Sequence, residues 1–296
     1  MADKIDSLFR DVQPLAKVTE GKPAPHENLA DILEIVAVAS GIRPAHLQGQ
    51  RQHDDQRLAE IEGIAERHGL KTIRTKTLKP FFHRTPRFDQ GIIDFENADN
   101  QKKQDDGPDV VWVYLDENVA AAIPGVVAGH GGISTVLGYP ECCVIFESER
   151  KIALGEAYAQ GIIDTYHAAS PDEVVRLWKG NVQVQVAVDP DHDIHDTSRS
   201  LRRFPYLQLV ACRTCSTNDN SAAARINHGM RDLAFGLAPS FGRRIWQARD
   251  LVINKGRPIP VGRNDPCRCG RGGKYKHCCL RDDPVPNRAN DVQLKA

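Results

Sequence analysis

The sequence predicts a mixed α/β body rich in helices, followed by a small cysteine-bound unit at the C-terminus. Two observations predict the body: several segments repeat apolar residues at helical spacing, and short β-branched or aromatic segments lie between them. A third observation predicts the C-terminal unit, because four of the eight cysteines lie among glycines and basic residues within residues 262–281. We therefore expect one large domain with a small appendage, which suits a chain of 296 residues.

Two buried helices are expected in the N-terminal part of the body. Residues 29–40 form an apolar run followed by Gly41, and residues 57–68 repeat apolar residues at helical spacing before Gly69. Glycine directly after the last apolar residue is a common helix stop. The preceding residues 1–28 contain only a short helical segment and a Pro/Gly stretch, so we expect a loosely attached N-terminal arm.

Strands are expected where β-branched and aromatic residues cluster. Residues 72–75, 110–115 and 182–188 fit this description, and the last of them alternates apolar and polar residues. The polar segment 84–108 shows neither the helical nor the strand repeat of apolar residues. We expect it to form an exposed loop. Further helices are expected over residues 118–127, 147–166, 171–178, 221–237 and 241–252.

These elements divide the chain into five parts. We expect an N-terminal arm (1–28), an α/β body (29–252), a linker (253–261), a cysteine-rich unit (262–281) and a disordered tail (282–296).

Charge is distributed unevenly along the chain. The 39 basic and 39 acidic residues give no formal net charge, which argues against a body built wholly to bind nucleic acid. Residues 243–281, however, contain 11 Lys or Arg and only 2 Asp or Glu. We expect this basic end to contact a protein partner, and RNA or a ribosome is the alternative.

The chain lacks the signals of membrane insertion and secretion. It has no apolar run of about 18 residues, and its first residues are not a basic stretch followed by an apolar core. We therefore expect a cytoplasmic protein without a membrane partner. Disulfides are rare in that compartment, so the cysteines point to metal binding or redox chemistry.

The last four cysteines have the spacing of a small metal site. Cys267 and Cys269 are separated by one residue, and after eight more residues Cys278 and Cys279 are adjacent. Four thiolates complete a tetrahedral zinc site, and the intervening glycines allow the backbone to fold back tightly. With few apolar residues, such a unit needs the metal in order to fold.

Residues 262–280, GRNDPCRCGRGGKYKHCCL, resemble the SEC-C motif found at the C-terminus of the preprotein translocase motor ATPase. Arg268, Arg271 and Gly273 replace the motif's usual Pro, Ser and Lys, but none of the three is a ligand. The resemblance implies that Cys267, Cys269, Cys278 and Cys279 bind structural Zn²⁺ and that the unit presents a basic surface to a protein or ribosomal partner. The chain contains no phosphate-binding loop, which excludes the motor ATPase itself.

The other four cysteines form a second candidate quartet in the body. Cys142 and Cys143 are adjacent, and after 68 residues Cys212 and Cys215 follow with a C-x-x-C spacing. Two such pairs suit a closed four-thiolate site if the fold brings them together. Zn²⁺, iron or an iron–sulfur cluster all accept four thiolates. A dithiol/disulfide pair at Cys212 and Cys215, or buried inert cysteines, are the remaining interpretations.

The block LGYPECCVIF, which contains the first pair, resembles an archaeal and bacterial family without an established biochemical role. In that family an L-G-Y-P-x-C-C-V block is followed by an aromatic-Pro stretch and a C-x-x-C. The resemblance covers roughly residues 110–237 and assigns no activity.

Together these patterns predict a cytosolic metal-binding protein. Its C-terminal SEC-C-type module is expected to bind Zn²⁺ and a partner, and its body is expected to hold a second metal, either Zn²⁺ or iron. The alternative is a metal- or thiol-dependent oxidoreductase whose reactive centre is the quartet of Cys142, Cys143, Cys212 and Cys215.

Overall fold

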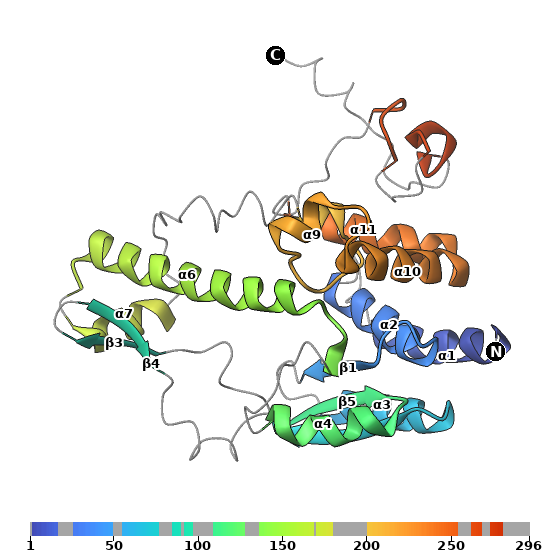
Figure 1. Ribbon diagram of the computed structural model, residues 1–296, viewed down its shortest axis with the longest axis horizontal. Coiled ribbons are helices and arrows are strands. Elements are labelled where there is room, and N and C mark those ends of the chain that lie inside the picture. Colours follow the sequence, from blue (N-terminus) through green and yellow to red (C-terminus); the bar gives the residue numbers. More distant parts are fainter. Residues whose placement is uncertain are drawn as a thin grey trace.

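A computed structural model gives the architecture of the chain (Figure 1). It describes residues 2–16, 26–49, 55–76, 85–89, 92–96, 109–127, 136–168, 170–179, 200–253, 262–267 and 273–280. The expected strand at 182–188 lies outside these residues.

A three-stranded antiparallel sheet lies at the centre of the N-terminal half. Strand β5 (Asp109–Tyr114) is the middle strand, flanked by β1 (Ala45–Gly49) and β2 (Lys71–Lys76). In this register Trp112 lies opposite Leu47 on one side and Ile73 on the other. Because its residues from Val110 to Tyr114 are all buried, β5 reads as a continuous apolar run. The sequence predicted β5 and β2 but missed β1.

Helices cover both faces of this sheet, and alternate residues of β5 face each layer. Val111 and Val113 join the main core cluster, which includes α2 (His26–Ala39) and α3 (Asp55–Arg67). On the other face, Trp112 and Tyr114 pack with α4 (Glu117–Val127). Helices α2 and α3 are followed by Gly41 and Gly69, whose φ angles of 72° and 70° confirm the predicted glycine stops.

Residues 2–16 are part of the core, whereas a loosely attached arm was expected over residues 1–28; residues 17–25 lie outside the described residues. Helix α1 (Ala2–Val12) and the 3₁₀ turn η1 (Gln13–Ala16) bury Leu8, Phe9, Val12 and Leu15 in the main cluster. The centroids of the Phe9 and Phe241 rings lie 4.8 Å apart. The short helical segment was predicted, but its attachment to the core was not.

The C-terminal half adds the helices α9 (Arg213–Thr217), α10 (Ala222–Leu237) and α11 (Pro239–Ile253). Helices α10 and α11 pack against α2, and α9 contacts α10. Ser221 caps α10 by accepting a hydrogen bond from the Ala224 amide (3.1 Å). The main core cluster also includes Cys267, Tyr275 and Cys279, so the C-terminal unit contacts the body.

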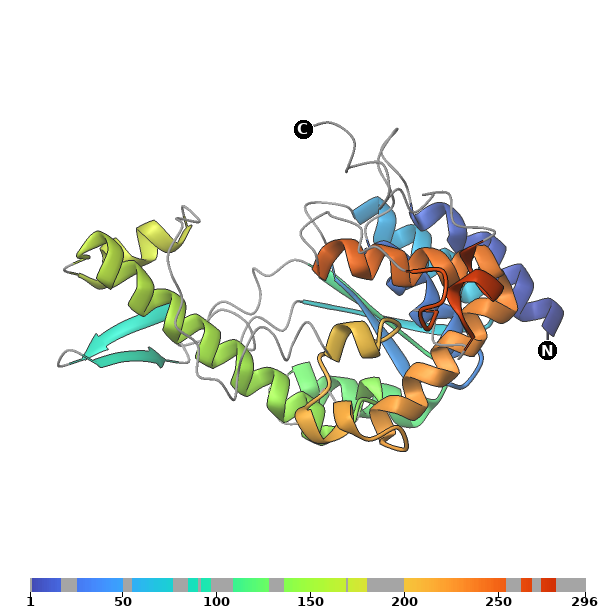
Figure 2. The ribbon, with the colours of Figure 1, turned by 90° about the horizontal axis from the view of Figure 1, so that it is seen from above.

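A long helix, α6 (Glu141–Tyr166), extends from the body to a smaller cluster (Figure 2). At its far end it contacts α7 (Pro171–Lys179) and the antiparallel hairpin of β3 (Thr85–Asp89) and β4 (Ile92–Glu96). Strands β3 and β4 correct the expectation of a loop for residues 85–89 and 92–96, and the rest of segment 84–108 lies outside the described residues. Paired strands can form in such a segment when a neighbouring element supplies the contacts.

The described architecture is therefore helix-rich, with a small three-stranded sheet, a two-stranded hairpin and a small C-terminal knuckle, and it confirms the predicted fold class. Among the described residues, no helix is long and apolar enough to cross a membrane.

Candidate metal centres

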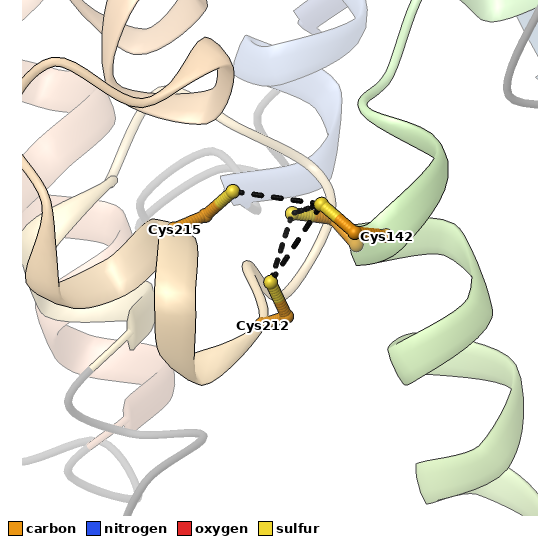
Figure 3. A group of neighbouring side chains, drawn as sticks. Cys142, Cys212 and Cys215 are labelled. Carbon is orange, nitrogen blue, oxygen red and sulfur yellow. Dashed lines mark hydrogen bonds between the residues drawn. The ribbon is translucent and has the colours of Figure 1, made fainter.

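The body quartet lies where the start of α6 meets the short helix α9. Cys142 and Cys143 occupy the first turn of α6, after Pro140 at its N-cap. Cys212 is the N-cap of α9, and Cys215 lies in its first turn. Figure 3 shows Cys142 pointing from α6 toward Cys212 and Cys215 on the opposing segment. The fold thus brings together all four cysteines that the sequence proposed.

The four sulfur atoms form a compact cluster. The Sγ atom of Cys142 lies 4.0 Å from that of Cys143, 3.8 Å from that of Cys212 and 3.7 Å from that of Cys215. The Cys143 and Cys212 sulfurs are 3.8 Å apart, and all four atoms lie within 4.8 Å of one another. Four sulfurs at about 2.3 Å from one zinc ion would lie about 3.8 Å apart. The donor set therefore fits a single tetrahedral metal ion.

Three of the four body cysteines are buried. They are Cys143, Cys212 and Cys215, whereas Cys142 is exposed. The buried cysteines pack among apolar side chains that include Phe204, Leu207 and Ala224. A set of four sulfurs is typical of a structural metal site, and Cys142 is its exposed member.

Burial opposes ionisation of the two α6 thiols. Burial, together with the thiols of Cys215 and Cys212, raises the pKa of Cys142 to about 11. Burial also raises the pKa of Cys143 well above its usual range. Burial also acts to raise the pKa of Cys212. Hydrogen bonds from the Cys215 amide and from the surrounding thiols outweigh this effect, so the pKa of Cys212 is lowered. A metal cation would supply the positive charge that the ionised thiols need.

Hydrogen bonds from two serines hold the segment that carries Cys212 and Cys215. The Ser200 hydroxyl donates to the Ala211 carbonyl (3.1 Å) and accepts from the Ala211 amide (2.9 Å). The Ser221 hydroxyl donates to the Cys215 carbonyl (2.9 Å) while it caps α10. The backbone on either side of the C-x-x-C is thus fixed by groups other than the thiols.

A buried ion pair holds the turn before Cys142. Arg43 Nε donates to Glu34 Oε2 at 3.1 Å, and these side chains are only 1% and 3% exposed. The Tyr139 hydroxyl donates to Glu34 Oε1 (3.0 Å), and the Arg43 guanidinium lies 3.8 Å from the centroid of the Tyr139 ring. Burial raises the pKa of Tyr139, and the Glu34 carboxylate adds to that rise, so the phenol stays a donor.

Gly138 is required in the same turn. Its φ of 70° is a left-handed conformation, and an added Cβ would lie 2.5 Å from Pro44 Cδ. The Gly138 carbonyl accepts a hydrogen bond from Arg43 Nη1 (3.4 Å).

Three described cysteines form the C-terminal cluster, and local backbone hydrogen bonds hold them together. The Sγ atoms of Cys267, Cys278 and Cys279 lie within 4.8 Å of one another, and those of Cys278 and Cys279 are 3.7 Å apart. The expected fourth ligand, Cys269, lies outside the described residues. The Cys267 amide donates to the Gly273 carbonyl (2.7 Å), and the Tyr275 amide donates to the Asp265 carbonyl (2.9 Å). These bonds fold the chain back so that the cysteines converge.

Sequence reasoning missed three residues that support the body cluster. Glu34 and Asp31 lie within the apolar run of α2, where both are buried, and Gln208 donates to Asp31 Oδ1 (3.2 Å). The available signal was two carboxylates three residues apart in an otherwise apolar helix, because buried acids need partners.

Comparison with known proteins identifies the C-terminal unit. The model of the SEC-C motif matches residues 263–281. Protein translocase subunit SecA of Halothermothrix orenii is 34% identical over 65 residues, which cover 18% of this chain and 8% of that protein. Protein translocase subunit SecA of Brachyspira hyodysenteriae is 67% identical over 24 residues, covering 8% of this chain and 2% of that protein.

The chain thus spans less than a tenth of the length of these relatives. No solved structure shows significant similarity to the chain. The C-terminal unit carries a SEC-C motif, and both cysteine clusters have the geometry to hold a metal ion.

Proposed function

We propose that this protein binds two metal ions per chain, one in the body and one in the SEC-C unit. Cys142, Cys143, Cys212 and Cys215 would hold the first. The set of Cys267, Cys269, Cys278 and Cys279 would hold the second, as Zn²⁺.

The convergence of the body cysteines carries this proposal. Two pairs separated by 68 residues meet with four measured sulfur–sulfur distances of 3.7–4.0 Å. This spacing favours one ion, Zn²⁺ or a single iron, over an iron–sulfur cluster, since bridging atoms in a cluster place the cysteine sulfurs around several metals. The distances are also too long for a disulfide.

The SEC-C unit is proposed to recruit a partner. Arg263 and Lys274 are exposed on the described part of the unit, and Lys276 is half-buried. These cations suit a partner with an acidic surface, either a protein or a ribosome. We place this function in the cytoplasm, because thiolate sites persist where cysteines are kept reduced.

The exposed Cys142 favours one alternative, a thiol- or metal-dependent oxidoreductase. Its sulfur is the solvent-facing member of the cluster and lies 3.7 Å from that of Cys215. An enzyme of this class would need an accessible ligand of this kind.

Metal analysis and an absorption spectrum after anaerobic purification test the proposal. We expect two metal equivalents, with the body cysteines protected from alkylation in the native protein. A colourless zinc protein supports a structural body site, and visible absorption supports the redox alternative. One equivalent with free alkylation of Cys142 and Cys212 contradicts the body site.

A further inference from the structure

Helix α2 carries two buried carboxylates that are each connected to one half of the body cluster. Asp31 and Glu34 lie three residues apart, which places them on the same face of the helix. Glu34 accepts a hydrogen bond from Tyr139, three residues before Cys142 (3.0 Å). Asp31 accepts one from Gln208, four residues before Cys212 (3.2 Å). One helix therefore contacts the approach to both cysteine pairs.

A basic side chain lies beside each carboxylate. Arg43 Nε lies 3.1 Å from Glu34 Oε2, and Arg57 Nη2 lies 3.7 Å from Asp31 Oδ2. Charged groups in a core are a costly route to stability, because well-packed apolar residues usually serve as well or better. Retaining two ion pairs beside the cysteine cluster is easier to explain by geometry, since a carboxylate fixes the direction of its hydrogen-bond donors.

We propose that α2 positions the body metal centre, with Glu34 acting through Tyr139 and Asp31 acting through Gln208 to set the two cysteine pairs against each other. The inference rests on the proposed metal-binding function. According to this inference, α2 as well as the metal fixes the distance between the two cysteine pairs. Groups outside the ligand set that orient ligands typically change metal affinity 10–100-fold when removed.

Two mild substitutions in the full chain test this role. Tyr139→Phe removes only the hydroxyl that reaches Glu34, and Gln208→Ala removes the side chain whose amide reaches Asp31. Both are made in a Cys267→Ser background, so that Zn²⁺ and Co²⁺ report on the body site alone. Matched controls lie further along α6: Tyr158→Phe repeats the first change, and Gln160→Ala removes an exposed amide that donates to Asp164 (2.8 Å).

We expect each of the two substitutions to weaken Zn²⁺ binding by about 10-fold in competition with a chromophoric chelator. The Co²⁺ ligand-field absorption should shift as well, because its energy and intensity follow the arrangement of the four sulfurs. The two controls should change neither. Thermal unfolding of the metal-free variants separates this effect from a loss of fold.

Several outcomes would overturn the inference. Unchanged affinity and spectrum in both variants would show that α2 has no positioning role. A loss in only one variant would contradict the claim that one helix holds both halves. If the Cys267→Ser parent itself binds no metal, then the proposed function fails rather than the positioning role.

Discussion

The body site draws its cysteines from two segments 68 residues apart, whereas the C-terminal site draws its four from a stretch of 13 residues. In the body, α6, α9 and α10 pack around the thiols, α2 contacts residues that precede both cysteine pairs, and hydrogen bonds from side chains hold the backbone on both sides of the cluster. In the C-terminal unit, the bonds that fold the chain back are local backbone bonds within residues 262–280.

The difference indicates at which site the fold prepares the metal site and at which site the metal organises the fold. The body has an apolar core and hydrogen bonds that position the thiols independently, so its fold prepares the site. The C-terminal unit contributes few apolar side chains, chiefly Tyr275 and Leu280, so there the metal is expected to organise the fold.

The largest expected effect is loss of order in the C-terminal unit without its metal. Cys267→Ser removes one of its thiolates, and metal binding supplies about 10–16 kcal/mol to folding in small zinc units. Amide exchange should become fast in residues 262–280 and stay slow in the body helices. Unfolding of the body in the same variant would show that the two parts are not separable in this way.

Substitution of a buried cysteine in the body should affect the body site and spare the C-terminal unit. Cys143→Ser is expected to lower the body's metal affinity by at least about 100-fold, and to cost the metal-free body about 1–3 kcal/mol because a hydroxyl is left buried. The C-terminal unit should keep its metal. Metal analysis with chemical denaturation of the metal-free form measures both effects, and Cys267→Ser is the matched control.

Acid should weaken metal binding at the body site. Burial raises the pKa of Cys142 to about 11 and also raises the pKa of Cys143, so both thiols must lose a proton when metal binds. Affinity therefore falls as the pH falls, by at least about 100-fold per unit, since each of these two protons contributes about tenfold. Competition titrations of the Cys267→Ser protein between about pH 6 and 8 check this, and an affinity that does not change with pH would contradict it.

The smallest expected effect concerns the body without metal. Ser221→Ala removes the α10 cap and the hydrogen bond to the Cys215 carbonyl, and should reduce the unfolding free energy by about 1 kcal/mol. Denaturant unfolding measures this in the metal-free protein. No change would indicate that the serine does not support the metal-free site.

The sequence predicted elements with a clear local apolar pattern and missed those that depend on neighbours. Residues 29–40 were readable as an apolar run that ends before Gly41, and residues 57–68 by their helical repeat. The β5 strand was readable as a short β-branched and aromatic run. Strand β1 was missed because His46 and Gln48 break the apolar pattern. Both side chains are nevertheless buried, and His46 Nε2 lies 3.4 Å from Gln48 Oε1. The β3–β4 hairpin was missed because the polar residues around it dominate segment 84–108, although β4 itself contains Ile92, Ile93 and Phe95.

For the candidate sites, the cysteines were predicted and their supports were not. Spacing alone nominated Cys142, Cys143, Cys212 and Cys215, since thiol pairs have a recognisable pattern. The link from Glu34 to Tyr139 spans 105 residues, and no local pattern encodes a contact at that separation. Tyr139 itself reads as an ordinary packing aromatic until its hydroxyl is placed on the Glu34 carboxylate.

X-ray absorption spectroscopy of the metal-loaded Cys267→Ser protein tests the central claim most directly, because the body site is then the one expected to be filled. We expect a single shell of four sulfur atoms at about 2.3 Å and no metal–metal distance. A shell containing nitrogen or oxygen, a short metal–metal distance, or a protein without bound metal would contradict a single-ion site built from the four body cysteines.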